Sequence, residues 1–225
     1  SGSADDDVVK IEYNAQGYIS KAIEDYEEGG ANSDYTRYTY DANNRLIKSE
    51  EVEDGNVDDY DTYEYTDGLV TAIKEHESDG TIESTRTFKY DGSKRLIEAT
   101  EEIDGDDYKQ TFEYDNKGNV TKAETLYGSA LSSRRIYENY DDKSTFYSSI
   151  KGLVEPTAMT NKNNPGKVTE YYFTDANGDG VVDTQPYETY MTAYTYKYNG
   201  EGFPTEVTEE EDDGELETTT FTYDC

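Results

Sequence analysis

The nine residues from Asp175 to Asp183 carry the most specific chemical pattern in the sequence. Oxygen-bearing side chains stand at positions 1, 3, 5 and 9, glycine stands at position 6, and position 7 offers a backbone carbonyl. The predicted calcium ligands are therefore Asp175, Asn177, Asp179, Val181 and Asp183. A calcium loop requires this spacing, because the glycine permits a sharp turn while alternate residues converge on one ion. Position 12 is Pro186 instead of a bidentate Glu, so a polar turn without calcium is the alternative.

Residues suited to catalysis form no comparable pattern. His76, the only imidazole, lies between two glutamates with no nucleophile nearby for it to activate. Cys225, the only thiol, has no partner for an intrachain disulfide. A pair of carboxylates would suit a glycosidase, but among 52 acidic residues such a pair carries no information. We therefore expect no enzyme, with a hydrolase using carboxylates opposite Arg134 or Arg135 as the alternative.

The net charge restricts the classes of partner. The 225 residues include 20 Lys and Arg against 52 Asp and Glu, which gives a formal charge of −32. Nucleic-acid binding depends on basic side chains that displace counterions, so we expect no nucleic-acid partner. No hydrophobic run approaches the length of about 18 residues that a membrane-spanning helix needs, and the predicted outer strand faces carry Glu, Lys and Thr. We expect no membrane-spanning segment.

A repeated tyrosine organises most of the chain. An aromatic or aliphatic residue stands two positions before this tyrosine, and Asp, Asn or Thr follows it. Successive repeat tyrosines from Tyr13 to Tyr114 are 27, 25, 25 and 24 residues apart, and the last two, Tyr198 and Tyr223, are 25 residues apart. Its members are Tyr13, Tyr40, Tyr65, Tyr90, Tyr114, Tyr198 and Tyr223. A constant period of this length indicates a repeat architecture. The tyrosine ring offers buried area, and its hydroxyl can meet water.

Two chain reversals are predicted in each repeat. One follows the tyrosine, and the other is an Asp-Gly pair 14 residues later, at Asp54-Gly55, Asp79-Gly80 and Asp104-Gly105. Asp-Gly is typical of a type I′ hairpin turn, which needs positive φ at both residues. Two strands of about 8 to 10 residues remain in each repeat, and residues such as Phe221 and Tyr223 alternate with threonines as in a half-buried strand. The sequence predicts an all-β, antiparallel up-and-down meander of about eight hairpins, curled into a barrel-like or hollow sheet.

The period fails over residues 126–167, where the net charge is +2 while the rest of the chain carries −34. We interpret this stretch as a partly irregular insert that caps or plugs the sheet, with a short helix around Thr145 to Leu153; two irregular strands and a long loop are the alternative. Residues 8–225 would then form one β-repeat domain behind an acidic leader, 1–7. The acidic clusters Asp104 to Asp107 and Glu209 to Asp213 are interpreted as solvated turns.

Tyrosine faces are able to stack on sugar rings, although tyrosines at strand period are also typical of a core. For a ligand at the open end of the sheet, the candidate residues are Tyr38, Tyr63, Tyr196, Phe146, Tyr147 and Arg134.

The unit Y-D-x-x-G/N-x-L/V, at Tyr40 to Leu46, Tyr90 to Leu96 and Tyr114 to Val120, resembles the tyrosine-aspartate repeats of Rhs-type proteins. More closely, the chain resembles a family of unknown function in lipoproteins of Gram-negative gut commensals. The residues involved are the repeats, the stretch from Tyr140 to Tyr147, and the stretch from Lys162 to Thr169. This resemblance implies a porin-like antiparallel β fold.

The acidic leader is similar to the segment that follows a lipidated cysteine in such proteins. The resemblance implies a lipid anchor upstream of residue 1 and a location at the cell surface or in the periplasm, on the outer membrane. We therefore expect a non-enzymatic surface module that binds an unidentified ligand, for which glycans or another envelope protein are candidates, or that has a structural role in the envelope. A calcium-stabilised adhesion module is a further alternative.

Overall fold

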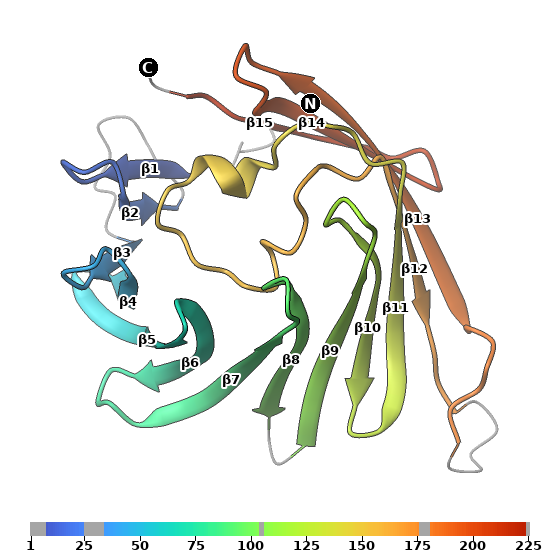
Figure 1. Cartoon of the computed structure of the whole chain (residues 1–225), viewed down its shortest axis with the longest axis horizontal. Coiled ribbons are helices and arrows are strands. Elements are labelled where there is room, and N and C mark those ends of the chain that lie inside the picture. Colours follow the sequence, from blue (N-terminus) through green and yellow to red (C-terminus); the bar gives the residue numbers. More distant parts are fainter. Residues whose placement is uncertain (1–7, 25–33, 104–105, 176–180, 224–225) are drawn as a thin grey trace. The chain divides into compact units, whose positions relative to one another are not determined.

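The computed structural model describes residues 8–24, 34–103, 106–175 and 181–223. Within these ranges fifteen strands follow one another in the sheet. Their order is that of the sequence, as the colours of Figure 1 show. The predicted all-β antiparallel meander is confirmed. Within the described ranges there is no helix with the length and apolar character needed to span a bilayer.

The contacts divide the chain into two compact units, Ser1–Thr87 with Ile150–Val154, and Phe88–Ser149 with Glu155–Cys225. The first unit contains β1 Lys10–Tyr13, β2 Ile19–Ile23, β3 Tyr35–Tyr40, β4 Leu46–Glu53, β5 Asn56–Thr66, β6 Leu69–Glu77 and most of β7 Ile82–Tyr90. The second contains β8 Leu96–Ile103, β9 Asp106–Tyr114, β10 Val120–Tyr127, β11 Ala130–Glu138, β12 Lys167–Tyr172, β13 Glu188–Tyr198, β14 Pro204–Glu211 and β15 Leu216–Thr220. Within each unit, every strand pairs antiparallel with the next.

The turn after the repeat tyrosine is built by the residue that follows it. Oδ1 of Asp41 accepts hydrogen bonds from the backbone N–H groups of Asn43 and Arg45, at 2.8 and 3.0 Å. The same two bonds form at Asn14, Asp91, Asp115 and Asn199. Backbone donors at residue i+4, ahead of the other contributions, lower the pKa of Asp41, Asp91 and Asp115. The short polar side chain therefore sets the reversal in both units.

The repeat tyrosine itself ties neighbouring hairpins together. Its hydroxyl donates a hydrogen bond to the backbone carbonyl at or next to the start of an earlier strand. The pairs are Tyr40 with Ile19 (2.8 Å), Tyr65 with Leu46 (2.7 Å), Tyr114 with Leu96 (2.7 Å), Tyr140 with Val120 (2.7 Å) and Tyr223 with Pro204 (2.8 Å). Tyr140 is not one of the seven repeat tyrosines named from the sequence, but it makes the same bond. The sequence indicated only that these hydroxyls can meet water, and it did not reveal their backbone partners. Each ring is only partly exposed, and a hydroxyl removed from water needs a protein partner.

The second class of turn is only partly as predicted. Asp54 and Gly55 have φ of 48° and 80°, the two positive values that a type I′ turn requires. At Asp79-Gly80 only the glycine has positive φ, because the loop is longer and Oδ1 of Asp79 accepts the N–H of Thr81 at 2.8 Å. Asp104-Gly105 lies outside the described residues.

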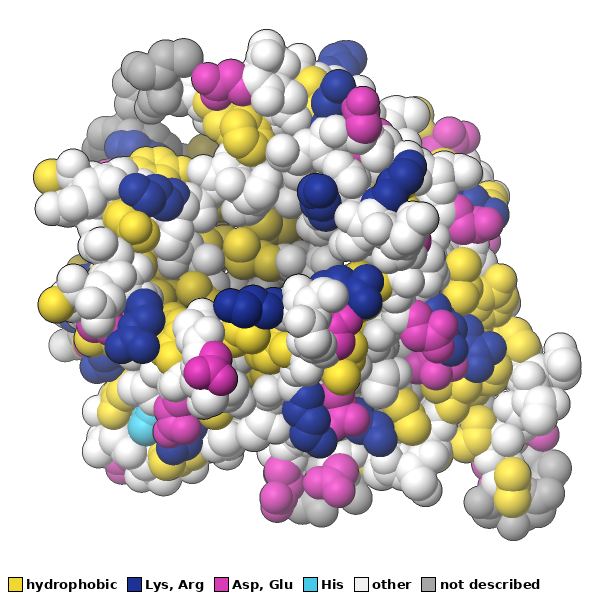
Figure 2. Space-filling view, viewed as in Figure 1, with side chains coloured by type: hydrophobic (Ala, Val, Ile, Leu, Met, Phe, Trp, Pro, Cys, Tyr) yellow, Lys and Arg dark blue, Asp and Glu magenta, His cyan; other side chains and the backbone are white. Residues whose placement is uncertain are grey.

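The core is thin and lies under the first residues of the returning strands. Ile19 and Leu46 in the first unit and Leu96 and Val120 in the second are each at most 4 % exposed. Charged side chains of both signs are interspersed on the face seen in Figure 2, and many form cross-strand ion pairs such as Arg37 with Glu50. Further buried aliphatic residues lie along the same strands of the first unit, Ile23 on β2, Val52 on β4, and Val70 and Ile73 on β6.

The irregular stretch is shorter than expected. β10 and β11 pair as far as Ile136, with one register shift at Thr125 and Leu126, and the connection without strands spans 139–166. The short helix expected over Thr145 to Leu153 is a single 3₁₀ turn, Phe146–Ser149. The β10–β11 turn uses Gly128 at φ 59° at the place where the period would put an Asp-Gly pair, which is why the pattern is lost at Leu126. The single β-repeat domain and the capping role of the insert stay predictions.

Candidate functional site: a tyrosine-lined cavity on β11, β12 and β13

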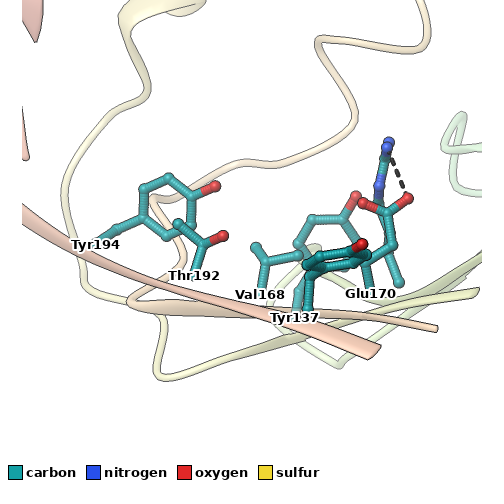
Figure 3. Close-up of a pocket in the computed structure, with 7 residues that line it drawn as sticks. Tyr137, Val168, Glu170, Thr192 and Tyr194 are labelled. Carbon is teal, nitrogen blue, oxygen red and sulfur yellow. Dashed lines mark ion pairs between the residues drawn. The ribbon is translucent and has the colours of Figure 1, made fainter. Parts of the chain in front are cut away.

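A cavity of about 250 Å³ lies on one face of three neighbouring strands of the second unit (Figure 3). It is lined by Arg135, Tyr137, Val168, Glu170, Tyr190, Thr192 and Tyr194. The strand registers explain why these side chains meet, because residues directly opposite one another project from the same face. Arg135 is opposite Glu170, which is opposite Tyr190; Tyr137 is opposite Val168, which is opposite Thr192.

The charges inside the cavity form one ion pair. A terminal nitrogen of Arg135 lies 2.8 Å from Oε1 of Glu170, the pair marked by the dashed line in Figure 3. The Arg135 side chain is 49 % exposed, so solvent screens this pair and its contribution to stability is small. The pair instead offers a donor and an acceptor side by side at the cavity wall.

The tyrosine hydroxyls stay protonated at neutral pH. A hydrogen bond to Glu188, together with burial, raises the pKa of Tyr190 to about 12. Burial, followed by the charge of Glu209, raises the pKa of Tyr194 to about 12. Burial also raises the pKa of Tyr137. Each hydroxyl can therefore both donate and accept hydrogen bonds.

Further aromatic rings extend the cavity in both directions along β13. Tyr172 meets Tyr190 edge-on, with ring centroids 5.9 Å apart. Beyond Tyr194, the rings of Tyr196 and Tyr198 follow at centroid distances of 6.4 and 6.0 Å. In Figure 2 hydrophobic side chains, a class that includes tyrosine there, gather over β12 and β13. The aromatic row is longer than the cavity itself.

The connection 139–166 holds one end of this row in place. The backbone N–H of Tyr194 donates to the carbonyl of Gly166 at 3.0 Å, and the hydroxyl of Tyr196 donates to the carbonyl of Pro165 at 2.9 Å. The hydroxyl of Tyr198 bonds to Asp141, and Nδ2 of Asn164 lies 3.3 Å from the same hydroxyl. The rings of Tyr196 and Tyr198 are therefore held in place before any ligand binds.

Buried asparagines anchor the same connection to β10. Asn119 is fully buried and exchanges two hydrogen bonds with Asn163, at 3.2 and 2.9 Å. Oδ1 of Asn161 accepts the N–H of Val120 at 2.9 Å. Among the described residues, no buried side-chain nitrogen or oxygen is left without a partner. The polar residues of the insert are therefore explained by structure.

None of the six residues predicted to bind a ligand lines the cavity, and they divide between the two units. In the second unit, Tyr196 continues the aromatic row, and Phe146 stacks on Phe221 at 4.2 Å with Tyr147 at its edge. Arg134 pairs with Glu124 at 2.7 Å and covers the ring of Phe173. Arg134 projects from the opposite face to Arg135, so the sequence prediction missed the cavity arginine by one residue.

In the first unit, Tyr63 is only 8 % exposed, and its hydroxyl lies 2.9 Å from Oγ of Ser49. Tyr38 is opposite Ser49 on the neighbouring strand and is half-buried. Tyr63 therefore belongs to the core of its unit. His76 stacks on Tyr60 at 4.6 Å and bonds to Thr62 at 2.9 Å, which accounts for it as a structural residue.

The predicted calcium loop is described only in part. Asn177 and Asp179 lie outside the described residues, and so do Cys225 and the acidic leader. Of the flanking positions, the N–H of Asp183 donates to the carbonyl of Thr174 at 3.0 Å. In the part of the chain that is described, no group of three or more His, Cys, Asp or Glu is placed to hold a metal. Calcium binding at Asp175, Asn177, Asp179, Val181 and Asp183 stays a prediction, which a calcium titration followed by melting temperature tests.

Known proteins of the same fold complete the description. No protein-family model and no curated protein matches the sequence. Among solved structures, a porin-like protein from Bacteroides uniformis superimposes with a TM-score of 0.56 at 14% identity, over 95% of this chain and 88% of that one. A porin-like protein from Bacteroides vulgatus gives 0.51 at 13% identity, over 94% and 93%. At these identities the similarity establishes the fold of this chain, a porin-like antiparallel β meander.

Proposed function

We propose that this chain is a non-enzymatic carbohydrate-binding module of a bacterial cell envelope and that the cavity on β11, β12 and β13 is its binding site. The observation that carries the proposal is the composition of the cavity wall. Three tyrosines surround one arginine–glutamate pair and a threonine. Aromatic rings with a few convergent polar groups are typical of small-molecule sites.

The chemistry of a sugar matches this wall. One face of a pyranose ring carries C–H groups that pack on an aromatic ring, while its hydroxyls need donors and acceptors around the edge. Tyr190 and Tyr194 offer rings, Glu170 offers an acceptor opposite Tyr190, and Arg135, opposite Glu170, offers a donor. The row that continues to Tyr198 suits a chain of sugars better than a single one.

A binding role fits the cavity better than hydrolysis. A glycosidase needs two carboxyl groups on either side of the bond that it cleaves. Glu170 is the one carboxylate among the seven lining residues, and Arg135 holds it in an ion pair. This wall therefore binds and orients a ligand without supplying the acid and the base.

An envelope location is supported by the two porin-like proteins from Bacteroides that share the fold. The acidic leader, with its similarity to segments that follow a lipidated cysteine, points to a lipid anchor upstream of residue 1. Membrane fractionation of the full-length protein, with and without the residue that would carry the lipid, tests this part separately.

Glycan-array screening followed by calorimetry tests the binding site. Tyr190→Ala is expected to weaken binding of any sugar found about thirtyfold, because truncating an aromatic contact in a binding site costs about 2 kcal/mol. Tyr147→Ala is the matched control, since Tyr147 is 39 % exposed and is not among the cavity residues. An array without any bound sugar would favour the structural role in the envelope, and equal losses in the two variants would move the site elsewhere.

A further inference from the structure

We infer that the cavity selects a sugar carrying a protonated amine, as in glucosamine units with free amino groups, over neutral and acidic sugars. This inference rests on the proposed carbohydrate-binding function and names the class of sugar. It follows from how the strands of the second unit distribute their charges between the two faces.

Carboxylates gather on the cavity face. Glu170 lies in the cavity wall, Glu188 precedes Tyr190 by two residues on β13, and Glu209 is opposite Tyr194. Strand alternation adds Glu211, opposite Thr192, and Glu217, opposite Glu209. The strands β11 to β15 thus present five glutamates and one arginine, Arg135, on this face.

The basic residues of the same strands project from the other face. Arg134, Lys167 and Lys197 are each one residue out of phase with the cavity positions. Their ion-pair partners are Glu124, Glu138 and Glu206, at 2.7, 3.1 and 2.6 Å. The positive charges of the opposite face are therefore paired with glutamates on that same face. On the cavity face, Arg135 forms an ion pair with Glu170 at 2.8 Å.

Mutual repulsion is already visible on the cavity face. Burial, followed by the charge of Glu217, raises the pKa of Glu209, and the charge of Glu209 contributes to the raised pKa of Tyr194. A cation placed between Tyr190 and Tyr194 would relieve this repulsion, whereas the carboxylate of a uronic acid would add to it. At long range, the net charge of −32 likewise attracts a cationic sugar and repels an anionic one.

Tyrosine rings add a specific attraction for an ammonium group. An ammonium over a tyrosine face is stabilised by about 0.5 to 2 kcal/mol, with the larger value when both are removed from water. The fold uses this contact in its first unit, where Nζ of Lys21 lies 3.6 Å from the ring centroid of Tyr35 and Nζ of Lys48 lies 3.7 Å from that of Tyr60. The cavity offers the same rings to an amine that arrives with the ligand.

Calorimetry with three short oligosaccharides of equal length tests the inference on the full chain: glucosamine, N-acetylglucosamine and galacturonate. We expect the free amine to bind about tenfold more tightly than its acetylated form, which corresponds to about 1.4 kcal/mol, and galacturonate to bind more weakly than both. The preference should fall at high salt and in the double variant Glu188→Gln with Glu209→Gln, while binding of the acetylated sugar is retained. Glu206→Gln with Glu210→Gln is the matched control, because both residues project from the opposite face.

Non-specific attraction of an amine to an acidic protein is distinguished by Tyr190→Ala, which should remove the preference although it leaves the net charge unchanged. A preference that survives in this variant would overturn the inference. Equal binding of the acetylated and free sugars would overturn it too, while leaving the proposed function intact. Binding of none of the three sugars, nor of any sugar on the array, would instead remove the proposed function on which it rests.

Discussion

Two tyrosine-bearing faces, one in each unit, show opposite uses of the same residue. On β5 of the first unit, Tyr63 is opposite Ile73, which is fully buried, and its hydroxyl lies against Ser49. On β13 of the second unit, Tyr190 is opposite Glu170 and is 45 % exposed. In this pair of residues, the tyrosine opposite an aliphatic side chain belongs to a core, and the tyrosine opposite an ion-paired glutamate lies at the wall of a cavity.

The largest difference between the two faces should appear in stability. Tyr63→Ala is expected to lower the free energy of unfolding by about 3 to 5 kcal/mol, as for other large aromatic residues in cores. Tyr190→Ala should lower it by less than about 1 kcal/mol, because much of its ring already meets solvent. Urea unfolding of the two variants measures both values, and similar losses would contradict the distinction between core and cavity.

Gly152, in the part of the connection 139–166 that belongs to the first unit, packs closely against Tyr18 and Tyr40. A methyl group at Gly152 would lie 2.7 Å from Cδ1 of Tyr18 and from Oη of Tyr40, and φ there is +93°. Gly152→Ala should therefore destabilise the protein by about 1 to 3 kcal/mol through overpacking, with backbone strain in addition. Gly200→Ala is the control, since nothing lies within 4 Å of the added methyl group. Thermal unfolding that treats the two variants alike would show that this anchor does not hold the connection.

Acidification separates two kinds of carboxylate. Burial, ahead of neighbouring carboxylates, raises the pKa of Asp59 in the first unit and of Glu209 in the second. The folded state then binds protons more readily than the unfolded state, so the free energy of unfolding should increase as the pH falls from neutral toward the ordinary values of 3.8 and 4.5. Asp41 and Asp91 have lowered pKa values, and the stability that they contribute is lost only as the pH falls below 3.8 through those values.

Melting temperatures across this range should therefore pass through a maximum on the acid side of neutrality. Asp59→Asn and Glu209→Gln should each reduce the rise in melting temperature as the pH falls from neutral. Asp91→Asn should instead reduce the loss of stability that occurs below pH 3.8. A melting temperature that falls steadily from neutral pH would contradict the raised pKa values of both units.

The smallest expected effect concerns the tyrosine-aspartate turns. Asn44 in the first unit and Lys94 in the second occupy the same turn position with φ of 59° and 65°. Lysine tolerates the left-handed region less well than asparagine, so Lys94→Gly should increase stability by up to about 1 kcal/mol and Asn44→Gly by less. Differential scanning calorimetry of the two variants checks the order, and a larger gain at Asn44 would reverse it.

Strand ends and turns were predictable because each depends on a few residues that are close together in the sequence. Tyr40 with Asp41, followed by turn-forming residues, indicates a strand end and an Asx-type turn, and the prediction held for the repeat pairs at Tyr40, Tyr90 and Tyr114. The pair Tyr60-Asp61, which lies within β5, shows that Tyr-Asp alone is not sufficient. The hydrogen bond of the tyrosine hydroxyl to Ile19 was not predictable in this way, since it depends on the position of a neighbouring hairpin.

The cavity was missed for a related reason. Its wall depends on registers between β11, β12 and β13, and β11 is separated from β12 by the connection 139–166, along which no period can be counted. A register shift at Thr125 and Leu126 also intervenes between β10 and β11. A difference of one residue exchanges the two faces of a strand, so Arg134, the arginine predicted to bind a ligand, projects away from the cavity that Arg135 lines. The alternating tyrosines from Tyr190 to Tyr198 were the available signal.

The tyrosine ties have a consequence for how such a chain changes its length during evolution. Each of the five hydroxyls reaches a carbonyl 18 to 21 residues earlier in the sequence, and each tie stays within its own unit. Contacts restricted to adjacent repeats make stability approximately a sum of local contributions. Duplication or deletion of one whole period would bring a new tyrosine opposite an equivalent carbonyl, so the array can grow or shrink by entire hairpins without redesign of its core.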